Sequence, residues 1–264
     1  MKFILFIILF SATPTLHLPA LTGKAVWNVG QGQWFTAISN LHCYHFDLGG
    51  EMAPLNKVIY HCKHRKNVVF LSHWDWDHIS FLRTRQFRSL KDICIAQRPQ
   101  GKASPSKMRL LASYKNCEKS LHNDSFFQDR DSKLDSQLYI NTYSNPPKKI
   151  HTLWSPTKFR SPNESSHVSI YEDWLLPGDS PRKQEKIWSQ KKHLQNIQFL
   201  LLGHHGSHTS TSEDLLRKLP RLQMAISSAR FQKHGHPHPQ VQGRLHVHKV
   251  ALLKTEDWGN IWFL

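Results

Sequence analysis

Short apolar runs alternate with polar, glycine-bearing segments along most of the chain, a pattern typical of an α/β protein. The apolar runs predict strands at residues 25–29, 34–38, 43–47, 68–71, 92–96, 150–154, 167–176, 197–202, 224–227, 250–253 and 261–264. Helical spacing predicts helices at residues 52–63, 79–90, 107–114, 182–194, 212–219 and 240–246. Gly30-Gln31-Gly32 separates the first two strands and predicts a hairpin turn. No internal repeat is found, and 264 residues suit one large domain.

The N-terminal 20 residues differ from the rest of the chain. A basic start, Met1-Lys2, precedes an apolar run at residues 3–10, and Leu18-Pro19-Ala20 offers a cleavage site. These features predict a signal peptide at residues 1–20 and export to the periplasm or the medium. An uncleaved anchor and a buried N-terminal strand are the alternatives. The apolar run is too short to span a bilayer well, and no other stretch is long enough to be a membrane helix.

The domain predicted for residues 21–264 contains one segment that is poor in core residues. Residues 121–149 are rich in Asp, Ser and Asn and are closed by Asn145-Pro146-Pro147. Such a composition cannot bury enough apolar surface to contribute to a core. We therefore expect a surface loop or insertion there rather than a linker between domains.

The net charge of the chain indicates what kind of partner it binds. The chain has 35 Lys and Arg against 19 Asp and Glu, a formal net charge of +16. This surplus favours an anionic partner, either nucleic acid or another phosphate-rich surface. A solvated exterior adapted to the composition of the host is the alternative, and no protein partner can be inferred.

The four cysteines do not have the spacing of a zinc knuckle, because no CxxC pair occurs. In an exported chain they could form two disulfides, for which three pairings exist. Four buried free thiols fit the sequence equally well. The residues concerned are Cys43, Cys62, Cys94 and Cys117.

The strongest chemical signal is a hexad, His73-Trp74-Asp75-Trp76-Asp77-His78, directly after the strand predicted at residues 68–72. Four residues that can bind a metal fall within six positions, and imidazole with carboxylate suits Zn²⁺ or Mn²⁺. In an extended hexad, alternation would direct His73, Asp75 and Asp77 to one side. Trp74 and Trp76 would enter the hydrophobic shell, and His78 would begin the next helix. The alternative is a charged turn in which Asp77 caps that helix.

Three later loops add further candidate ligands. Gly178-Asp179 supplies a carboxylate after an apolar strand, and His204-His205-Gly206 supplies imidazoles after another. Residues 234–238 contain three more histidines. Each loop alone could be an ordinary turn. Together with the hexad they predict a two-metal hydrolytic centre at strand ends.

Eight short motifs carry a family resemblance. They are Val29-Gly30-Gln31-Gly32, Phe46-Asp47-Leu48-Gly49-Gly50, Leu71-Ser72 with the hexad, Trp154-Ser155-Pro156, Asn163-Glu164-Ser165-Ser166, Pro177-Gly178-Asp179, His204-His205-Gly206-Ser207 and Gly235-His236-Pro237-His238-Pro239. As a set, the motifs are highly specific. From about residue 26 to 263 the chain resembles the metallo-β-lactamase-fold domain of the bacterial competence protein ComEC.

The resemblance implies an αββα sandwich that binds two divalent metal ions, zinc or manganese, and hydrolyses a phosphodiester, most plausibly in DNA. It implies that His73 and Asp75 bind one metal and that Asp179 bridges both. The other metal would be bound by Asp77, His78 and His205. His204 is the alternative to His205, which we prefer because it directly precedes the glycine.

The resemblance also implies roles in catalysis. The cations would activate the water that attacks phosphorus, and Asp77 would orient that water. His236 or His238 would protonate the leaving group. Four residues would face the phosphate: Ser207, His208, Thr209 and Ser210.

The chain also departs from the family pattern. The family commonly has Asp where Asn28 and Gln33 stand, and Thr where Pro177 stands. Asp75 replaces a common His, and the usual third histidine has no counterpart except His122 or His151 by order. A nitrogen-poor first site favours Mn²⁺ or weak occupancy. The membrane channel of ComEC is also missing. Two further hypotheses follow: a hydrolase of a small phosphodiester or ester, and a DNA-binding module with a degraded site.

Overall fold

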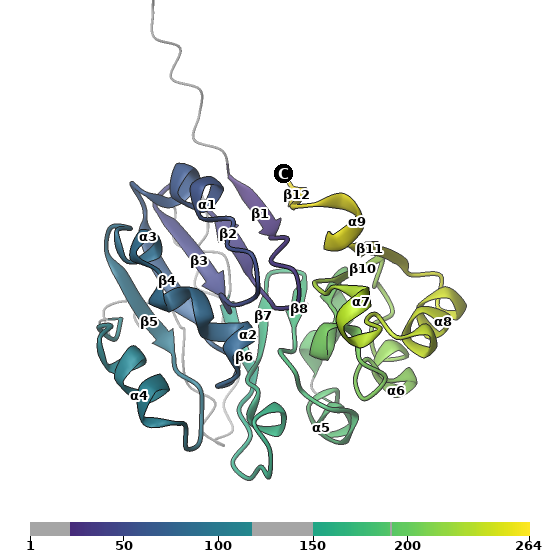
Figure 1. The fold of residues 1–264 in the computed structure, drawn as a ribbon. Helices are drawn as coiled ribbons and strands as arrows, with labels where there is room; N and C mark the ends of the chain where they lie inside the picture. The colour runs from purple at the N-terminus through teal and green to yellow at the C-terminus, as the bar shows by residue number, and fades with distance from the viewer. Residues whose placement is uncertain (1–21, 118–149, 191) are drawn as a thin grey trace, which may run out of the picture.

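We describe a computed structural model of the protein, which defines residues 22–117, 150–190 and 192–264 (Figure 1). The predicted signal peptide at residues 1–20 and the predicted loop at residues 121–149 lie outside the described residues. None of the helices within the described ranges is both long and apolar enough to cross a bilayer.

Two six-stranded sheets form the centre of the molecule. The first has the order β12-β1-β2-β3-β4-β5, with β1 Gly23–Val26, β2 Phe35–Ile38, β3 His42–Phe46, β4 Lys66–Phe70, β5 Ile93–Gln97 and β12 Ile261–Phe263. The second has the order β11-β10-β9-β8-β7-β6, with β6 Ile150–Trp154, β7 Val168–Tyr171, β8 Trp174–Leu176, β9 Phe199–Leu201, β10 Met224–Ser227 and β11 Ala251–Lys254. Since β12 pairs antiparallel with β1, the C-terminal strand completes the N-terminal sheet.

The helices are short. They are α1 Leu55–Cys62, α2 Trp76–Ile79, α3 Arg85–Arg88, α4 Pro105–Ala112, α5 Arg182–Trp188, α6 Glu213–Leu216, α7 Phe231–His234, α8 Pro239–Val247 and α9 Thr255–Trp258. Figure 1 shows α1, α3 and α4 outside the first sheet, and α5, α6 and α8 on the far side of the second.

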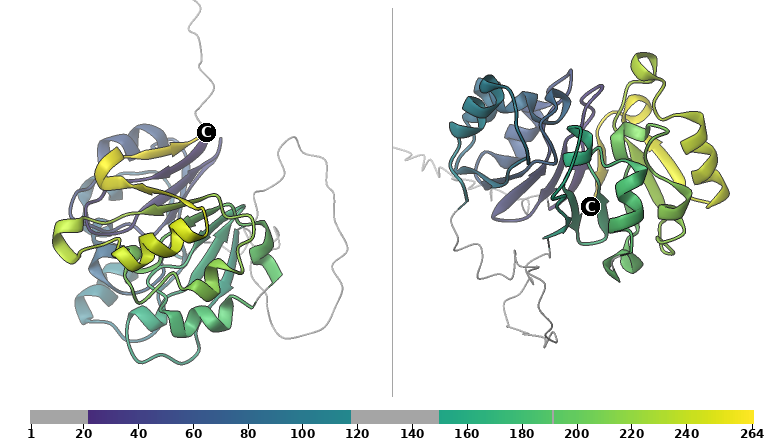
Figure 2. Two further views of the ribbon diagram at one scale, coloured as in Figure 1. Left: turned by 90° about the vertical axis from the view of Figure 1, so that its right-hand side faces the viewer. Right: turned by 90° about the horizontal axis from the view of Figure 1, so that it is seen from below.

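Three hydrophobic clusters separate the layers. One lies between the sheets and includes Phe46 and Phe70 from the first with Trp174 and Leu201 from the second. The other two join each sheet to its own outer helices. Three cores separate four layers, and the two views of Figure 2 show the same helix, sheet, sheet, helix order. The predicted αββα sandwich is therefore confirmed.

Several predicted elements differ in extent. The helix expected at residues 79–90 is broken into α2, a 3₁₀ turn at Ser80–Arg83 and α3, because Thr84 has extended backbone and caps α3 by accepting from the Phe87 N–H. The strand expected at residues 167–176 is the antiparallel pair β7 and β8, since the chain turns between them at Glu172, whose φ is 54°.

Two disulfides account for all four cysteines. Cys43 is bonded to Cys62 and Cys94 to Cys117. The structure thus selects the disulfides over the free thiols that the sequence also allowed. Both bonds lie in the N-terminal half, where they join β3 to the end of α1 and β5 to the segment after α4.

Candidate metal centre

The hexad at residues 73–78 follows β4 but is not extended throughout. Helix α2 begins at Trp76, with Asp75 at the N-cap position, so that His78 lies inside the helix and the alternative of an Asp77 cap is wrong. Trp74 is buried, as predicted, whereas the Trp76 side chain is 37% exposed, which is a correction. Once the helix begins, the two-residue alternation no longer sets side-chain direction, and Trp76 turns outward.

The turn before β2 and the glycine motif after β3 hold the hexad in place through their backbones. The Gln33 N–H donates to the Asp77 carbonyl at 3.0 Å, and the Leu48 N–H donates to the His78 carbonyl at 2.8 Å. A Cβ at Gly49 would lie 2.4 Å from the Asp77 carbonyl carbon. Only glycine permits this approach, so the motif after β3 fixes where Asp77 and His78 stand.

The loop after β8 brings Asp179 to the same place. Gly178 has a φ of 54°, and a Cβ there would lie 2.6 Å from the Ser72 Cβ. The Asp179 N–H donates to the Ser166 hydroxyl at 3.1 Å. The motif that ends at Ser166 therefore positions the carboxylate rather than contacting the hexad imidazoles itself.

Asp179 faces histidines with both of its carboxylate oxygens. Oδ1 lies 3.1 Å from His78 Nε2 and 3.9 Å from His205 Nε2. Oδ2 lies 3.7 Å from His73 Nε2 and also 3.7 Å from His204 Nε2. The structure therefore brings both members of the His204-His205 pair to opposite sides of one carboxylate.

The remaining predicted ligands complete the cluster. Asp77 Oδ2 is 3.2 Å from His205 Nε2, which is itself 3.2 Å from His78 Nε2. His73 Nε2 is 3.4 Å from Asp75 Oδ2. The His205 ring is oriented by its Nδ1, which lies 3.1 Å from the Ser228 carbonyl oxygen after β10.

Apart from Cys43, His45 and Cys62, whose two cysteines form a disulfide, two groups of three described residues have candidate ligand atoms within 4.8 Å of one another and could each hold a metal ion. They are His73, His78 and Asp179, and Asp77, His78 and His205. His73 Nε2 and Asp179 Oδ1 are buried and make no hydrogen bond. Unsatisfied buried polar atoms are costly, and a divalent cation would satisfy both. The donor set and these two atoms fit a metal, although Asp75 lies in neither group.

Asp47, for which the sequence predicted no role, contacts the cluster through the His78 nitrogen that faces away from the candidate ligands. Its Oδ2 is 2.8 Å from His78 Nδ1 and accepts from the Ser72 hydroxyl at 2.8 Å. Its Oδ1 accepts from the Ser72 N–H at 2.7 Å. A carboxylate on the far nitrogen of a ligating imidazole fixes the ring and raises its basicity. Asp47 stands in the glycine motif after β3, and that motif was its only sequence signal.

The Asp47 carboxylate also explains why Gln33 stands where the family commonly has Asp. Gln33 Nε2 donates to Asp47 Oδ2 at 3.0 Å, within the buried interior. An aspartate at position 33 would place a second negative charge against Asp47. The neutral amide instead donates a hydrogen bond, so the charge missing from the first hairpin is replaced by a polar contact.

The cluster is strongly coupled electrostatically. Burial opposes the charged form of His78, but Asp179 and Asp47 overcome it and hold its pKa well above the ordinary value. Burial likewise opposes ionisation of Asp179, yet His78, His205 and His73 hold the pKa of its carboxyl well below the ordinary value. Buried charges therefore persist only by mutual pairing, as expected where a cation would otherwise balance them.

The two outer carboxylates behave similarly. The adjacent His73 imidazole lowers the pKa of Asp75 despite partial burial. For Asp77, burial is outweighed by the hydrogen bond from His205 and the charge of His78, and the pKa is lowered. Both side chains are therefore ionised and available as ligands.

The residues of the predicted phosphate-contacting segment, 207–210, differ in their exposure and in their hydrogen bonds. The Ser207 and Thr209 hydroxyls lie 3.0 Å apart, and Thr209 Oγ1 is 3.1 Å from His204 Nδ1. His208 is exposed, whereas Ser210 is buried and donates to the Ser180 carbonyl at 3.0 Å. His208 and Thr209 are thus exposed, whereas Ser207 and Ser210 are buried.

Of the predicted proton donors, His236 lies beside His204 and His238 beside His208. The His236 ring centroid is 6.0 Å from that of His204, and its buried Nδ1 makes no hydrogen bond. Burial, followed by the charges of His205 and His204, lowers the pKa of His236 to about 4. His238 accepts from the Gln240 N–H through its side chain and so caps α8.

Neither candidate for the third histidine has a described side chain. His122 lies outside the described residues. His151 is in β6, opposite Ile170 of β7, and its side chain is not among the described ones.

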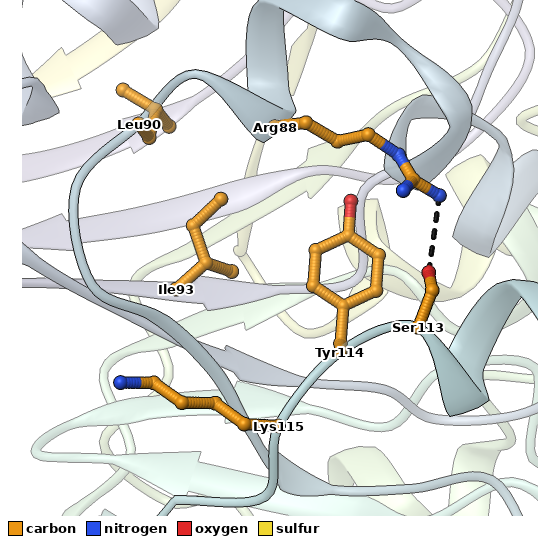
Figure 3. Close-up of a pocket in the computed structure, with 6 residues that line it drawn as sticks. All are labelled: Arg88, Leu90, Ile93, Ser113, Tyr114 and Lys115. Atoms are coloured by element: carbon orange, nitrogen blue, oxygen red, sulfur yellow. Dashed lines mark hydrogen bonds between the residues drawn. The ribbon is translucent and has the colours of Figure 1, made fainter.

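A pocket of about 380 Å³ lies elsewhere, lined by residues that include Arg88, Ile93 and Tyr114 (Figure 3). Ile93 pairs with Asn67 at the start of β4, while the hexad follows the end of β4. The pocket is therefore toward the opposite end of the sheet from the histidine and aspartate cluster.

Comparison with known proteins agrees with this architecture. A metallo-β-lactamase fold protein from Bacillus subtilis, YhfI, superposes with a TM-score of 0.55 at 13% identity, covering 91% of this chain and 99% of that one. The chain has the metallo-β-lactamase fold. At this identity the match shows the fold alone, and no family model matches the chain.

Sequence relatives place this metallo-β-lactamase-fold chain beside competence proteins. It is 39% identical over 106 residues to recombination protein 2 of Haemophilus influenzae and 31% identical over 107 residues to ComE operon protein 3 of B. subtilis. It is 38% identical over 66 residues to competence protein ComA of Neisseria gonorrhoeae. These matches span 39%, 39% and 25% of the chain but only 13%, 14% and 10% of the relatives. The predicted resemblance to ComEC-like proteins is confirmed.

Proposed function

We propose that this protein is a metal-dependent phosphodiester hydrolase that acts on DNA. The observation that carries the proposal is the buried Asp179, which has an imidazole pair facing each of its oxygens. A shared carboxylate with ligands on both sides is what a two-cation centre requires. The neighbouring metallo-β-lactamase-fold proteins and the competence relatives support a hydrolase on this fold.

The ligands would be divided around Asp179 and His78. His73 would lie on one side, and Asp77 with His205 on the other. Asp75, 3.4 Å from His73, would join the first position, and His204 would add a nitrogen there. In this position, His204 would supply the nitrogen ligand that the sequence left missing at the first metal position.

When bound, two zinc or manganese ions would lower the pKa of the attacking water and stabilise the charge that develops on the phosphoryl oxygens. Asp77, whose carboxylate is held ionised, would orient that water. Ser207, His208 and Thr209 would contact the phosphate beside His204.

His236 or His238 would contact the leaving oxygen through a ring N–H. The His236 ring, with its pKa near 4, is neutral at pH 7 and carries one proton. In His238, Nδ1 accepts from Gln240, which leaves the proton on Nε2. Either ring could therefore donate an N–H hydrogen bond to the leaving oxygen, and the proton that this oxygen takes up would come from water.

DNA is the substrate best supported by charge and by the relatives. A net charge of +16 favours a polyanion over a neutral ester. The relatives are named for recombination and competence. The two disulfides support an oxidising compartment, and we propose export to the periplasm or the medium.

The proposal is tested by incubating the purified chain with single- and double-stranded DNA and with bis-p-nitrophenyl phosphate, in Mn²⁺ or Zn²⁺. We expect DNA cleavage that falls at least about 100-fold in Asp179→Ala and Asp77→Ala. Asp214→Ala, on an exposed carboxylate of α6, is the matched control and should retain activity.

Two outcomes would overturn the proposal in favour of the other hypotheses. Cleavage of the small diester with intact DNA would indicate a small-substrate hydrolase. DNA binding without turnover, unaffected by Asp77→Ala, would indicate a binding module with a degraded site.

A further inference from the structure

An exposed tryptophan stands at the rim of the metal centre. Trp76 lies between two of the predicted ligands, Asp75 and Asp77, and its side chain is 37% exposed. Four other tryptophans of the chain, Trp27, Trp34, Trp174 and Trp188, are fully buried. Large exposed aromatic groups beside a site are a feature that folding alone does not require.

Two cations accompany the Trp76 ring. The Arg83 guanidinium carbon lies 4.6 Å from the ring centroid, and Lys107 Nζ lies 5.1 Å from it. Arg83 comes from the 3₁₀ turn after α2 and Lys107 from α4. Elements on two sides of the hexad therefore place positive charge on one indole beside the metal ligands.

Lys107 also connects this rim to the first metal position. Its Nζ is 3.9 Å from Asp75 Oδ1, at the limit of an ion pair. The pairing is loose and partly exposed, and so contributes little stability by itself. A phosphate that approached the cluster would find Lys107 and Arg83 close by, with an aromatic surface between them.

This combination matches the chemistry of a nucleotide. Stacking on an aromatic side chain needs a base that is not already stacked in a duplex, whereas cations contact the phosphates regardless of sequence. A cation already over the ring can stack on a base as well, since arginine planes pack on both.

We propose that Trp76, Arg83 and Lys107 bind an unpaired nucleotide that flanks the scissile phosphodiester. Trp76 stacks on its base, and the two cations contact its phosphates. The inference rests on the proposed function, because it takes the adjacent cluster as the cleavage site. It adds that the substrate is a single strand, or a duplex end that frays, and that the strand leaves the centre along α2.

Binding tests the proposal without catalysis. Affinities for a fluorescent single-stranded oligonucleotide are measured by anisotropy on metal-free protein in EDTA, and we expect Trp76→Ala to bind about tenfold more weakly. Trp76→Phe should recover most of the affinity. Tyr60→Ala is the matched control, because Tyr60 is 75% exposed near the end of α1, which leads into the start of β4 and so lies toward the other end of the sheet.

An abasic strand separates stacking from charge. The loss caused by Trp76→Ala should disappear when the oligonucleotide lacks bases. Arg83→Ala and Lys107→Ala should weaken both strands and each reduce the slope of affinity against salt by about one ion, unlike Lys57→Ala on α1.

Equal affinity of Trp76→Ala and the unaltered chain for the normal strand would overturn the proposal, and so would an equal loss on normal and abasic strands. Cleavage by the unaltered chain is measured separately. Absence of cleavage with intact Trp76-dependent binding would refute the proposed function but not the nucleotide contact, so the two failures are distinguishable.

Discussion

At the scale of single residues, Asp47 links the sheet to the metal centre. It has a φ of 50°, in the left-handed region, and accepts hydrogen bonds from Ser72 and Gln33 while contacting His78. A non-glycine residue in this region is held there by its surroundings. Its side chain is thereby fixed behind the imidazole that belongs to both candidate ligand groups.

Removing this support should weaken metal binding without removing a ligand. We expect Asp47→Asn to lower affinity for Zn²⁺ or Mn²⁺ by about 10- to 100-fold, because the His78 ring loses its negatively charged partner. Isothermal titration calorimetry on chelator-treated protein measures the change.

The control for Asp47 is another aspartate in the same backbone conformation. Asp92 has a φ of 48°, but its side chain is exposed in the turn before β5. Asp92→Asn should bind metal as the unaltered chain does. An unchanged affinity in Asp47→Asn would refute the supporting role.

A second buried residue, His45, has its tautomer fixed by its hydrogen bonds. The Asn67 amide donates to the carbonyls of Cys62, Arg65 and Lys91, so its oxygen must face His45 Nε2, 3.0 Å away, and accept its proton. His45 Nδ1 then accepts from the Trp34 indole N–H at 3.2 Å. A proton on Nδ1 would oppose that donor.

The stability of the fold should therefore depend on pH through His45. Burial lowers its pKa to about 4, below the ordinary 6.5, although the bond to Asn67 opposes the shift. The contribution of neutral His45 to the free energy of unfolding is complete above pH 6.5. It is lost as the pH falls toward 4, because the unfolded chain binds the proton at a higher pH than the folded chain does. Complete loss amounts to about 3 kcal/mol.

Urea unfolding at several pH values between 7 and 4 checks this dependence. In His45→Gln, which keeps a donor and an acceptor but does not titrate, the free energy of unfolding should fall less steeply over this range. His64→Gln, on an exposed ring, should retain the original slope. Parallel curves for the unaltered chain and His45→Gln would contradict the assignment.

At the scale of elements, strand ends were predictable because apolar runs followed by glycine or aspartate mark them. The strands before the hexad and before His204 were placed correctly to within a few residues, whereas the single strand expected before Asp179 is the pair β7 and β8. Broken helices were less predictable. Apolar spacing from Ile79 to Leu90 continues through Thr84, and only the cap to Phe87 shows that a new helix begins there.

The candidate site was predictable for the same reason. The prediction failed where a contact joins residues that are distant in sequence. His73, Asp77, His78, Asp179 and His205 follow strands and do lie together. The supporting role of Asp47 and the exposure of Trp76 depend on packing between segments distant in sequence. The local pattern of apolar and polar residues carries no information about such packing. The His204-His205 choice was posed as exclusive, yet two successive residues of positive φ bring both rings to Asp179.

The disulfide between β3 and α1 should contribute measurably to stability. Cys43 and Cys62 are 19 residues apart and both are buried. Closing a loop of this size lowers the entropy of the unfolded chain by the equivalent of about 3 kcal/mol. We expect Cys43→Ala/Cys62→Ala to lose about that much unfolding free energy in denaturant titrations.

Reductant provides the control for this variant. Under strong reduction both proteins also lose the Cys94–Cys117 bond, and the difference between them should shrink to the small effect of the side-chain changes. A double variant that matches the unaltered chain under oxidising conditions would show that the bond adds no stability.

At the scale of the whole molecule, the candidate metal centre draws its residues from both sheets. His73, Asp77 and His78 follow β4 of the first sheet, whereas Asp179 and His205 follow β8 and β9 of the second. The inter-sheet core lies between the same strands. A cation bound by both sets would therefore connect the sheets at one edge, where several buried charges meet.

Metal should accordingly raise the melting temperature of the entire domain. A ligand that binds only the folded state at 100 times its Kd adds about 2.7 kcal/mol, which corresponds to an increase of roughly 5–10 °C for a domain of this size. Differential scanning calorimetry on chelator-treated protein, with and without Mn²⁺ or Zn²⁺, measures the shift as one cooperative transition. Asp179→Asn should abolish most of it, while Asp214→Asn on α6 keeps it. An equal shift in Asp179→Asn would place the stabilising cation elsewhere and refute a centre shared by the two sheets.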